Sequence, residues 1–229
     1  MKKIQKYIYG TRQNQMSDFV TSHRIAAQLK KQILKGKYPP GTRIRQEDIA
    51  DEFKASRSPV REALRILEAD GLVTLIANTG AWISELSLSD CEELYQIRER
   101  VEPLLLKLSL PNLTDEHISM LMTIKKQLEN TKSIEDFLEL DRQFHLLTYE
   151  GASTMLLGPM VERLWNTTQH YRRAYSKMLE TEGFKPAHLE HELLLNAIIR
   201  KDLEDAERIL YGHIRRTRLE LEKHPEVFN

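Results

Sequence analysis

The sequence holds one cysteine, Cys91, in 229 residues. A lone thiol cannot form an internal disulfide, so the sequence shows no sign of an oxidising compartment. Long apolar runs are also missing: the longest, LLLKLSL, is interrupted by Lys107 and is far shorter than the roughly 18 residues of a membrane span. The first residues, MKKIQKYIYGTRQ, lack the apolar centre of a secretory signal peptide. We therefore expect a cytoplasmic protein without a membrane partner.

Glycine and proline are scarce, at 9 and 8 residues, whereas 30% of the residues are charged and 41% are hydrophobic. This composition is typical of a helix-rich globular protein and argues against a fibrous or disordered chain. The length of 229 residues leaves room for two modest domains.

The net charge of zero conceals an asymmetry between the two parts of the chain. Residues 1–84 contain 15 Lys and Arg against 8 Asp and Glu, and the remainder contains 19 against 26. The first part therefore carries +7 and the second −7. A basic part joined to an acidic part suggests that only the first meets a polyanion. The alternative is an accident of composition.

The first part of the chain predicts a small domain of short elements. Residues 1–16 are polar and basic without periodicity, so we expect a flexible arm. The domain itself is expected over residues 17–85. It begins with a helix from about Thr21 that ends at Gly36, and a second helix follows over 46–53.

The segment SRSPVREALRILEADGL at 56–72 predicts a third, amphipathic helix. Ser58 is a suitable N-cap, and Pro59 fits the first helical position because its missing N–H costs nothing there. Gly71 supplies a left-handed exit. The apolar residues recur at helical spacing and form one stripe, which consists of Val60, Ala63, Leu64 and Leu67.

Two runs of strand-forming residues follow this helix, LVTLI at 72–76 and AWIS at 81–84, and ANTG connects them. Three helices and a two-stranded wing are the pattern of a winged helix-turn-helix. In a helix-turn-helix, the first residues of the recognition helix meet base edges in the major groove. The third helix therefore predicts a surface that binds double-stranded DNA.

Arg57 and Arg61 occupy the start of this helix, and Arg65 continues the row at i, i+4 spacing. Arginine can bind O6 and N7 of guanine bidentately, which suits base readout. The alternative is that these arginines are solvated or paired with nearby carboxylates, namely Glu62, Asp51 or Glu52.

Other residues near the helix start are candidates for contacts with the DNA backbone. Ser56 and Ser58, together with backbone N–H groups, suit phosphate oxygens. The tip of the wing is a further candidate and comprises Asn78, Thr79 and Gly80.

From Ser89 onward the pattern is helical. Short connections between the helices predict an antiparallel all-α bundle over residues 86–229. Pro103 could kink or split the first helix. The helices are expected at about 89–110, 114–130, 133–149, 154–179, 187–200 and 203–222.

Four polar residues of this second part share an unusual placement. Asp141 and His145 lie at i, i+4 on one helix, and His191 and His213 lie on the apolar stripes of the last two helices. Three imidazoles and a carboxylate facing one core would suit zinc, nickel, cobalt or manganese. The alternative is that each histidine is a hydrogen-bonded core residue.

The stretch IAAQLKKQILKGKYPPGTRIRQEDIADEFKASRSPVREALRILEADGLV resembles the DNA-binding domain of the GntR family of bacterial transcription regulators. The resemblance extends over about residues 22–84 and is most specific in YPPGTRI and SRSPVREALRILEADGLV. It implies a homodimer that binds a near-palindromic operator, with Arg57 and Arg61 in contact with DNA. Repression is the usual mode of the family.

The segments DRQFH and LEHELLLNAIIRKDLEDAERILYGHI resemble the FCD ligand-binding domain of the FadR-like branch, over about residues 90–220. The resemblance implies a divalent metal ion, zinc before nickel, cobalt or manganese, held by Asp141, His145, His191 and His213. His188 lies three residues before His191 and could replace it, but the motif favours His191.

The effectors of this branch are often carboxylates, so the resemblance implies a small organic acid near the metal. Arg98 is the leading candidate to bind the acid because a planar guanidinium suits a carboxylate; Arg172 is a second candidate. The alternative role for Arg98 is a surface or interdomain ion pair.

Two other readings of the second part stay open. The metal itself could be the signal, or a buried metal could activate water as in a hydrolase. The sequence contains neither H-E-x-x-H nor G-x-S-x-G nor a P-loop. We therefore expect a regulator and not an enzyme.

Overall fold

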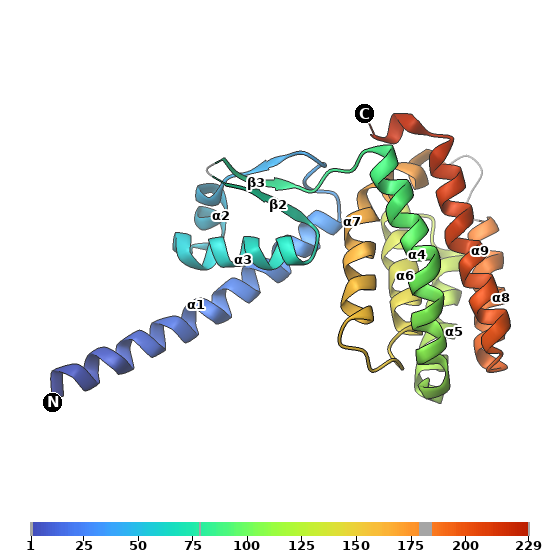
Figure 1. Ribbon diagram of the computed structural model, residues 1–229, viewed down its shortest axis with the longest axis horizontal. Coiled ribbons are helices and arrows are strands. Elements are labelled where there is room, and N and C mark those ends of the chain that lie inside the picture. Colours follow the sequence, from blue (N-terminus) through green and yellow to red (C-terminus); the bar gives the residue numbers. More distant parts are fainter. Residues whose placement is uncertain (1, 78, 179–184, 229) are drawn as a thin grey trace. The chain divides into compact units, whose positions relative to one another are not determined.

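The computed structural model describes residues 2–77, 79–178 and 185–228 (Figure 1). The chain divides into two compact units, residues 1–85 and 86–229. The first combines helices with a small sheet, and the described residues of the second are helical with short connections. This is the fold class expected from the sequence, a winged helix-turn-helix followed by an all-α bundle. Within the described part of the chain, no helix is both long and apolar enough to cross a membrane.

The first unit contains three helices and an antiparallel sheet in its described residues. The helices are α1 (Lys2–Leu34), α2 (Gln46–Phe53) and α3 (Arg57–Ala69), and the strands are β1 (Arg43–Ile44), β2 (Val73–Ile76) and β3 (Gly80–Ile83). β3 lies between β1 and β2, and β2 and β3 form the wing.

The core of the first unit lies between α1 and α3. Apolar residues recur at helical spacing on both helices, so each presents one stripe to the other. The stripes are fully buried and comprise Ile25, Leu29 and Ile33 of α1 with Val60, Leu64 and Leu67 of α3. Because this face of α3 packs in the core, the row of Arg57, Arg61 and Arg65 faces solvent.

Two features of this unit differ from the sequence-based expectation. Residues 2–16, expected as a flexible arm without periodicity, form the first part of helix α1, in keeping with the absence of proline before Pro39. β1 was not expected, because a strand of two residues, Arg43 and Ile44, leaves no periodicity in a sequence.

The start of α3 also differs by two residues. The N-cap is Ser56 and not Ser58, so Pro59 is the third helical residue instead of the first. Because the first four N–H groups of a helix have no intrahelical acceptor, a proline at this position costs no hydrogen bond. Gly71 has φ +76°, the left-handed exit that the sequence predicts.

The second unit is a bundle in which α4 packs along α9 and α7. α4 passes through Pro103 without splitting. Thr114, Ser133 and Asp202 cap α5, α6 and α9, as their positions predict. The helices are α4 (Leu88–Ser109), α5 (Asp115–Asn130), α6 (Ile134–Thr148), α7 (Leu157–Met178), α8 (Lys185–Ile199) and α9 (Leu203–Glu222), with 3-10 turns at η1 (Leu110–Asn112) and η3 (Pro225–Phe228).

Candidate DNA-reading helix and metal centre

The N-terminal end of α3 presents the residues that the sequence selects for DNA contact. Ser56, Arg57, Ser58, Arg61 and Arg65 are all exposed. Their outward position follows from the buried stripe, since residues 57, 61 and 65 lie about a quarter turn around the helix from Val60, Leu64 and Leu67.

Two of these arginines have carboxylate neighbours. Arg57 lies 3.3 Å from Glu47 of α2, and its side chain is 75% exposed. Arg65 lies 3.4 Å from Glu62. Exposed pairs of this kind contribute at most about 1 kcal/mol, so both guanidinium groups can exchange their partner for a base or a phosphate. Arg61 has no ion pair with any described residue.

A hollow of about 470 Å³ lies between the start of α3 and the wing. Four arginines line it, namely Arg43, Arg45, Arg61 and Arg65, together with Thr79 and Gly80 of the wing. Arg43 donates a hydrogen bond of 2.7 Å to the carbonyl oxygen of Thr79 and so holds the wing tip in place. Arg43 and Arg45 are not distinguished by any pattern in the sequence, and Asn78 lies outside the described residues.

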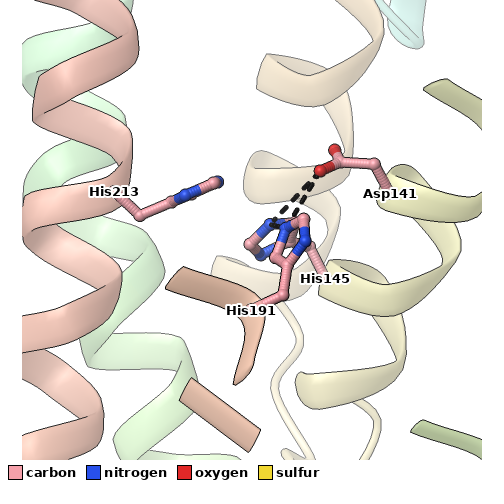
Figure 2. A group of neighbouring side chains, drawn as sticks. All are labelled: Asp141, His145, His191 and His213. Carbon is pink, nitrogen blue, oxygen red and sulfur yellow. Dashed lines mark hydrogen bonds and ion pairs between the residues drawn. The ribbon is translucent and has the colours of Figure 1, made fainter. Parts of the chain in front are cut away.

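In the second unit, the structure brings Asp141, His145, His191 and His213 together from three helices (Figure 2). Asp141 and His145 come from α6, His191 comes from α8, and His213 reaches in from α9. Their four candidate ligand atoms lie within 4.8 Å of one another. His188 does not belong to this cluster.

Two of the contacts in the cluster have a spacing that suits a single ion, whereas Nε2 of His145 lies 3.9 Å from Oδ1 of Asp141. Oδ1 of Asp141 lies 3.0 Å from Nε2 of His191, and Nε2 of His145 lies 3.2 Å from Nε2 of His191. Two ligand atoms about 2.1 Å from one ion lie roughly 3.0 to 3.4 Å apart when they subtend about 90° to 110°. Both distances fall in this range.

The protonation of the cluster also suits a cation. Burial lowers the pKa of His145 well below its ordinary value and lowers that of His213 as well. Burial opposes the charge on Asp141, but the guanidinium of Arg172 and a hydrogen bond with His191 outweigh it and hold that pKa well below its usual range. The cluster therefore offers a carboxylate at Asp141 and neutral imidazoles at His145 and His213.

The Nδ1 atoms of the three histidines differ in their hydrogen-bond partners. Nδ1 of His213 lies 2.7 Å from Oε2 of Glu190. Nδ1 of His145 and Nδ1 of His191 are buried without a hydrogen-bond partner among the described residues. Glu190 also accepts hydrogen bonds from Arg216. Burial opposes its ionisation, but these bonds lower the pKa of Glu190 to about 2.

A cavity of about 270 Å³ adjoins the cluster. Asp141, His145 and His213 line it, and Arg98, Arg172 and Arg216 add three guanidinium groups. The aromatic part of its wall consists of Tyr95, Phe137, Trp165 and Tyr175. The volume lies just below the range of about 300 to 1,000 Å³ for drug-sized ligands, so the cavity suits a small molecule.

Arg98 and Arg172, the two candidates for binding an acid, both lie in this cavity wall and both have carboxylate partners. Arg172 forms an ion pair with Asp141. Arg98 donates a hydrogen bond of 2.5 Å from Nε to Oε1 of Glu102 and another of 3.0 Å to Oγ1 of Thr168. The ion pair of Arg98 is therefore neither on the surface nor between the units: it is buried within α4, and Arg98 still lines the cavity.

Glu102 is buried and accepts hydrogen bonds from several residues. Besides the bond from Arg98, Tyr149 and Trp165 donate to its Oε2, at 2.7 and 3.0 Å. Replacing Glu102 with alanine leaves the charge of Arg98 buried without its partner. We expect a loss of about 3 to 5 kcal/mol in the free energy of unfolding, measured by urea denaturation. Glu102→Gln, which keeps the shape, should lose less. A loss below about 1 kcal/mol in Glu102→Ala would contradict this role.

These two units define a class of protein: a transcription regulator with a winged helix that reads DNA and a helical unit with a cavity. Residues 21–83 match the gntR family of bacterial regulatory proteins, and residues 93–216 match the FCD domain. The chain belongs to the GntR family and carries an FCD domain. Members of this family are DNA-binding regulators and not enzymes, which agrees with the expectation from the sequence.

Several relatives are similar along most of the chain. The HTH-type transcriptional regulator YdhC of Bacillus subtilis (strain 168) is 32% identical over 81% of this chain and 84% of its own. The Exu regulon transcriptional regulator of Escherichia coli (strain K12) is 27% identical over 86% and 83%. Among solved structures, E. coli McbR/YncC has a TM-score of 0.78 at 24% identity, over 89% of this chain and 97% of that one, which shows a shared fold.

Proposed function

We propose that this regulator binds a near-palindromic operator as a homodimer and that a small carboxylate in the cavity of the second unit controls its affinity. Arg57 and Arg61 read bases, Arg65, Ser56 and Ser58 contact phosphates, and the wing residues 78–80 touch the DNA backbone. The observation that carries this proposal is the exposed arginine row at the start of α3, beside a hollow lined by further arginines.

The residues of the second unit fit a divalent metal ion. Asp141, His145, His191 and His213 would hold it through one carboxylate oxygen and three imidazole nitrogens, a donor set that suits zinc and also nickel, cobalt or manganese. When bound, the ion supplies positive charge and a coordination position for an oxygen of the effector. The two units correspond to a DNA-binding domain over residues 17–85 and an effector domain over 86–229.

Charge favours an acid as the effector only when the metal is present. Each arginine of the cavity is balanced by a carboxylate: Arg98 by Glu102, Arg172 by Asp141 and Arg216 by Glu190. A divalent ion adds positive charge to a cavity whose three arginines are each already paired with a carboxylate. Arg98 and Arg172 then orient the carboxylate of the effector. This proposal places the regulator in the cytoplasm, where it acts as a repressor.

A row of exposed apolar residues on α4 supports the homodimer. Ile97, Leu104 and Leu108 lie on one stripe of the helix and are 37%, 47% and 46% exposed. A second copy of this chain would cover such a stripe. Leu104→Glu is expected to turn the dimer into a monomer in analytical ultracentrifugation. Leu193→Glu, at an equally exposed position on α8, should leave the dimer intact, and a dimer in both variants would refute this interface.

Selection of genomic fragments by the purified protein, followed by sequencing, tests the function. Enrichment of one near-palindromic site is expected. The retained site then serves to measure affinity while metal and acids are varied separately. If zinc alone changed operator affinity without any acid, the metal would be the signal instead. Folded protein that retains no site under any of these conditions would contradict the proposal.

A further inference from the structure

The cavity contains a third arginine, Arg216 on α9, which belongs to none of the sequence motifs described above. Its side chain is 31% exposed, whereas those of Arg98 and Arg172 are 3% and 10% exposed. Arg216 lies one helical turn after His213, and both line the cavity. Of the three guanidinium groups, that of Arg216 is the most accessible to a molecule that enters from solvent.

Glu190 on α8 connects Arg216 to the metal cluster. Nε of Arg216 donates a hydrogen bond of 2.6 Å to Oε1 of Glu190, and Nη2 donates to Oε2. Nδ1 of His213 also donates to Oε2, at 2.7 Å. This bond holds the proton on Nδ1, so Nε2 of His213 is the nitrogen left for a metal.

These contacts leave one nitrogen of the Arg216 guanidinium, Nη1, available for a hydrogen bond to a ligand. Of its donor nitrogens, Nε and Nη2 are occupied by Glu190, and Nη1 makes no hydrogen bond with a described residue. A guanidinium can bind two anions at different edges because it carries five N–H donors. Arg216 can therefore keep Glu190 in place while Nη1 binds a second carboxylate.

We propose that Arg216, Glu190 and His213 form a coupling element in which Nη1 of Arg216 binds the carboxylate of the effector and Glu190 orients His213 toward the metal. The inference deepens the proposed function and rests on its metal site. Acid and metal have opposite charges and occupy one cavity of low dielectric, so each strengthens the binding of the other. By linkage, both affinities rise by the same factor.

Zinc and acetate are suitable probes, and Trp165 provides the signal. Trp165 lines the cavity, and the only other tryptophan, Trp82, lies in β3 of the first unit. In a Trp82→Phe background, fluorescence reports acetate binding to zinc-loaded protein. Competition with a chelator of known affinity gives zinc affinity in the presence and absence of acetate.

Two substitutions separate the two roles. Glu190→Gln is expected to weaken zinc binding about 10- to 100-fold and to alter the visible spectrum of the Co²⁺-loaded protein, because His213 loses its charged partner. Arg216→Met is expected to weaken acetate about 10-fold or more and to remove the increase in zinc affinity that acetate causes. Arg216→Lys keeps the positive charge but loses the planar guanidinium. Its acetate affinity should therefore lie between that of Arg216→Met and that of wild type.

The matched control is a second ion pair, formed by two residues of α9. Arg208 forms an ion pair with Glu204 on that helix, away from the cavity, so Arg208→Met and Glu204→Gln should change neither affinity. If wild type binds zinc but Glu190→Gln and Arg216→Met bind zinc and acetate as it does, the coupling element is wrong and the metal site stands. If folded wild type binds no zinc, the metal site and the coupling element both fail.

Discussion

Replacing Arg61 with alanine is expected to weaken operator binding about 5- to 150-fold per half-site, because one bidentate contact with guanine is worth about 1 to 3 kcal/mol. Arg57→Ala should have an effect of similar size. Both side chains are exposed on α3, outside the stripe that packs on α1. The fold and the metal content should therefore stay unchanged, and fluorescence anisotropy with the selected operator gives the affinities.

The control for this experiment is Arg24→Ala, which removes the same charge from an exposed position on α1 outside the arginine row. Loss of one positive charge far from the groove should lower affinity slightly and equally for specific and non-specific DNA. Removal of a base-reading arginine should instead lower the affinity for specific DNA more than that for non-specific DNA. It should also relax the sequence preference at one position. Operator binding that is unchanged in both Arg57→Ala and Arg61→Ala would refute the assignment of α3 as the reading helix.

Replacing His191 with alanine is expected to lower zinc affinity more than about 100-fold, since removal of a direct ligand should exceed the 10- to 100-fold effect of losing a second-shell partner. His145→Ala should act in the same direction. Zinc content after dialysis, measured by inductively coupled plasma mass spectrometry, should fall from about one ion per chain to a small fraction. The thermal stabilisation that zinc gives to wild type should disappear in both variants.

The sequence offers a matched control three residues earlier in the same helix. His188 lies outside the cluster, so His188→Ala should keep its zinc. A zinc-free His188→Ala combined with a fully loaded His191→Ala would show that the ligand set is wrong. Because burial lowers the pKa of His145 and His213, protons should compete with zinc at these positions only below about pH 6.5. Protonation of His145 and His213 should therefore contribute little to any change of zinc affinity between about pH 8 and pH 6.5.

The fold was largely predictable because its signals are local. Thr114, Ser133 and Asp202 mark helix starts through cap chemistry, and the stripe of α3 identifies its buried face. Errors arose where local signals are weak. β1 consists of Arg43 and Ile44 only, and its pairing with β3 depends on residues far along the chain. Ser56 and Ser58 are equally suitable caps by residue type, and the structure places Ser56 at the N-cap without a side-chain capping hydrogen bond.

The candidate site was predictable to the extent that helical spacing and family motifs identify it. The pair Asp141 and His145 shares a helix face, and the structure brings His191 and His213 to the same point. What sequence reasoning missed are the partners behind these residues. Glu190 lies next to His191 in HLEH and Arg216 lies three residues after His213, but nothing in the sequence indicates that the two side chains meet.

Arg98 illustrates the same limit. Its spacing to Glu102 at i, i+4 permits an ion pair in any helix, exposed or buried. Only the packing of α7 against α4, which brings Trp165 and Thr168 to this pair, makes it a buried network in a cavity wall. Burial depends on long-range packing, so it was the least predictable property of the site.

The central claim is that the metal cavity of the second unit controls DNA binding by the first. Its most direct test is the operator dissociation constant of zinc-loaded protein, measured with and without an acid that binds the cavity, in wild type and in Asp141→Ala. We predict that the acid weakens operator binding in wild type and has no effect in Asp141→Ala. In the absence of the acid, the two proteins should bind the operator equally well. An acid effect of equal size in both proteins would contradict the claim.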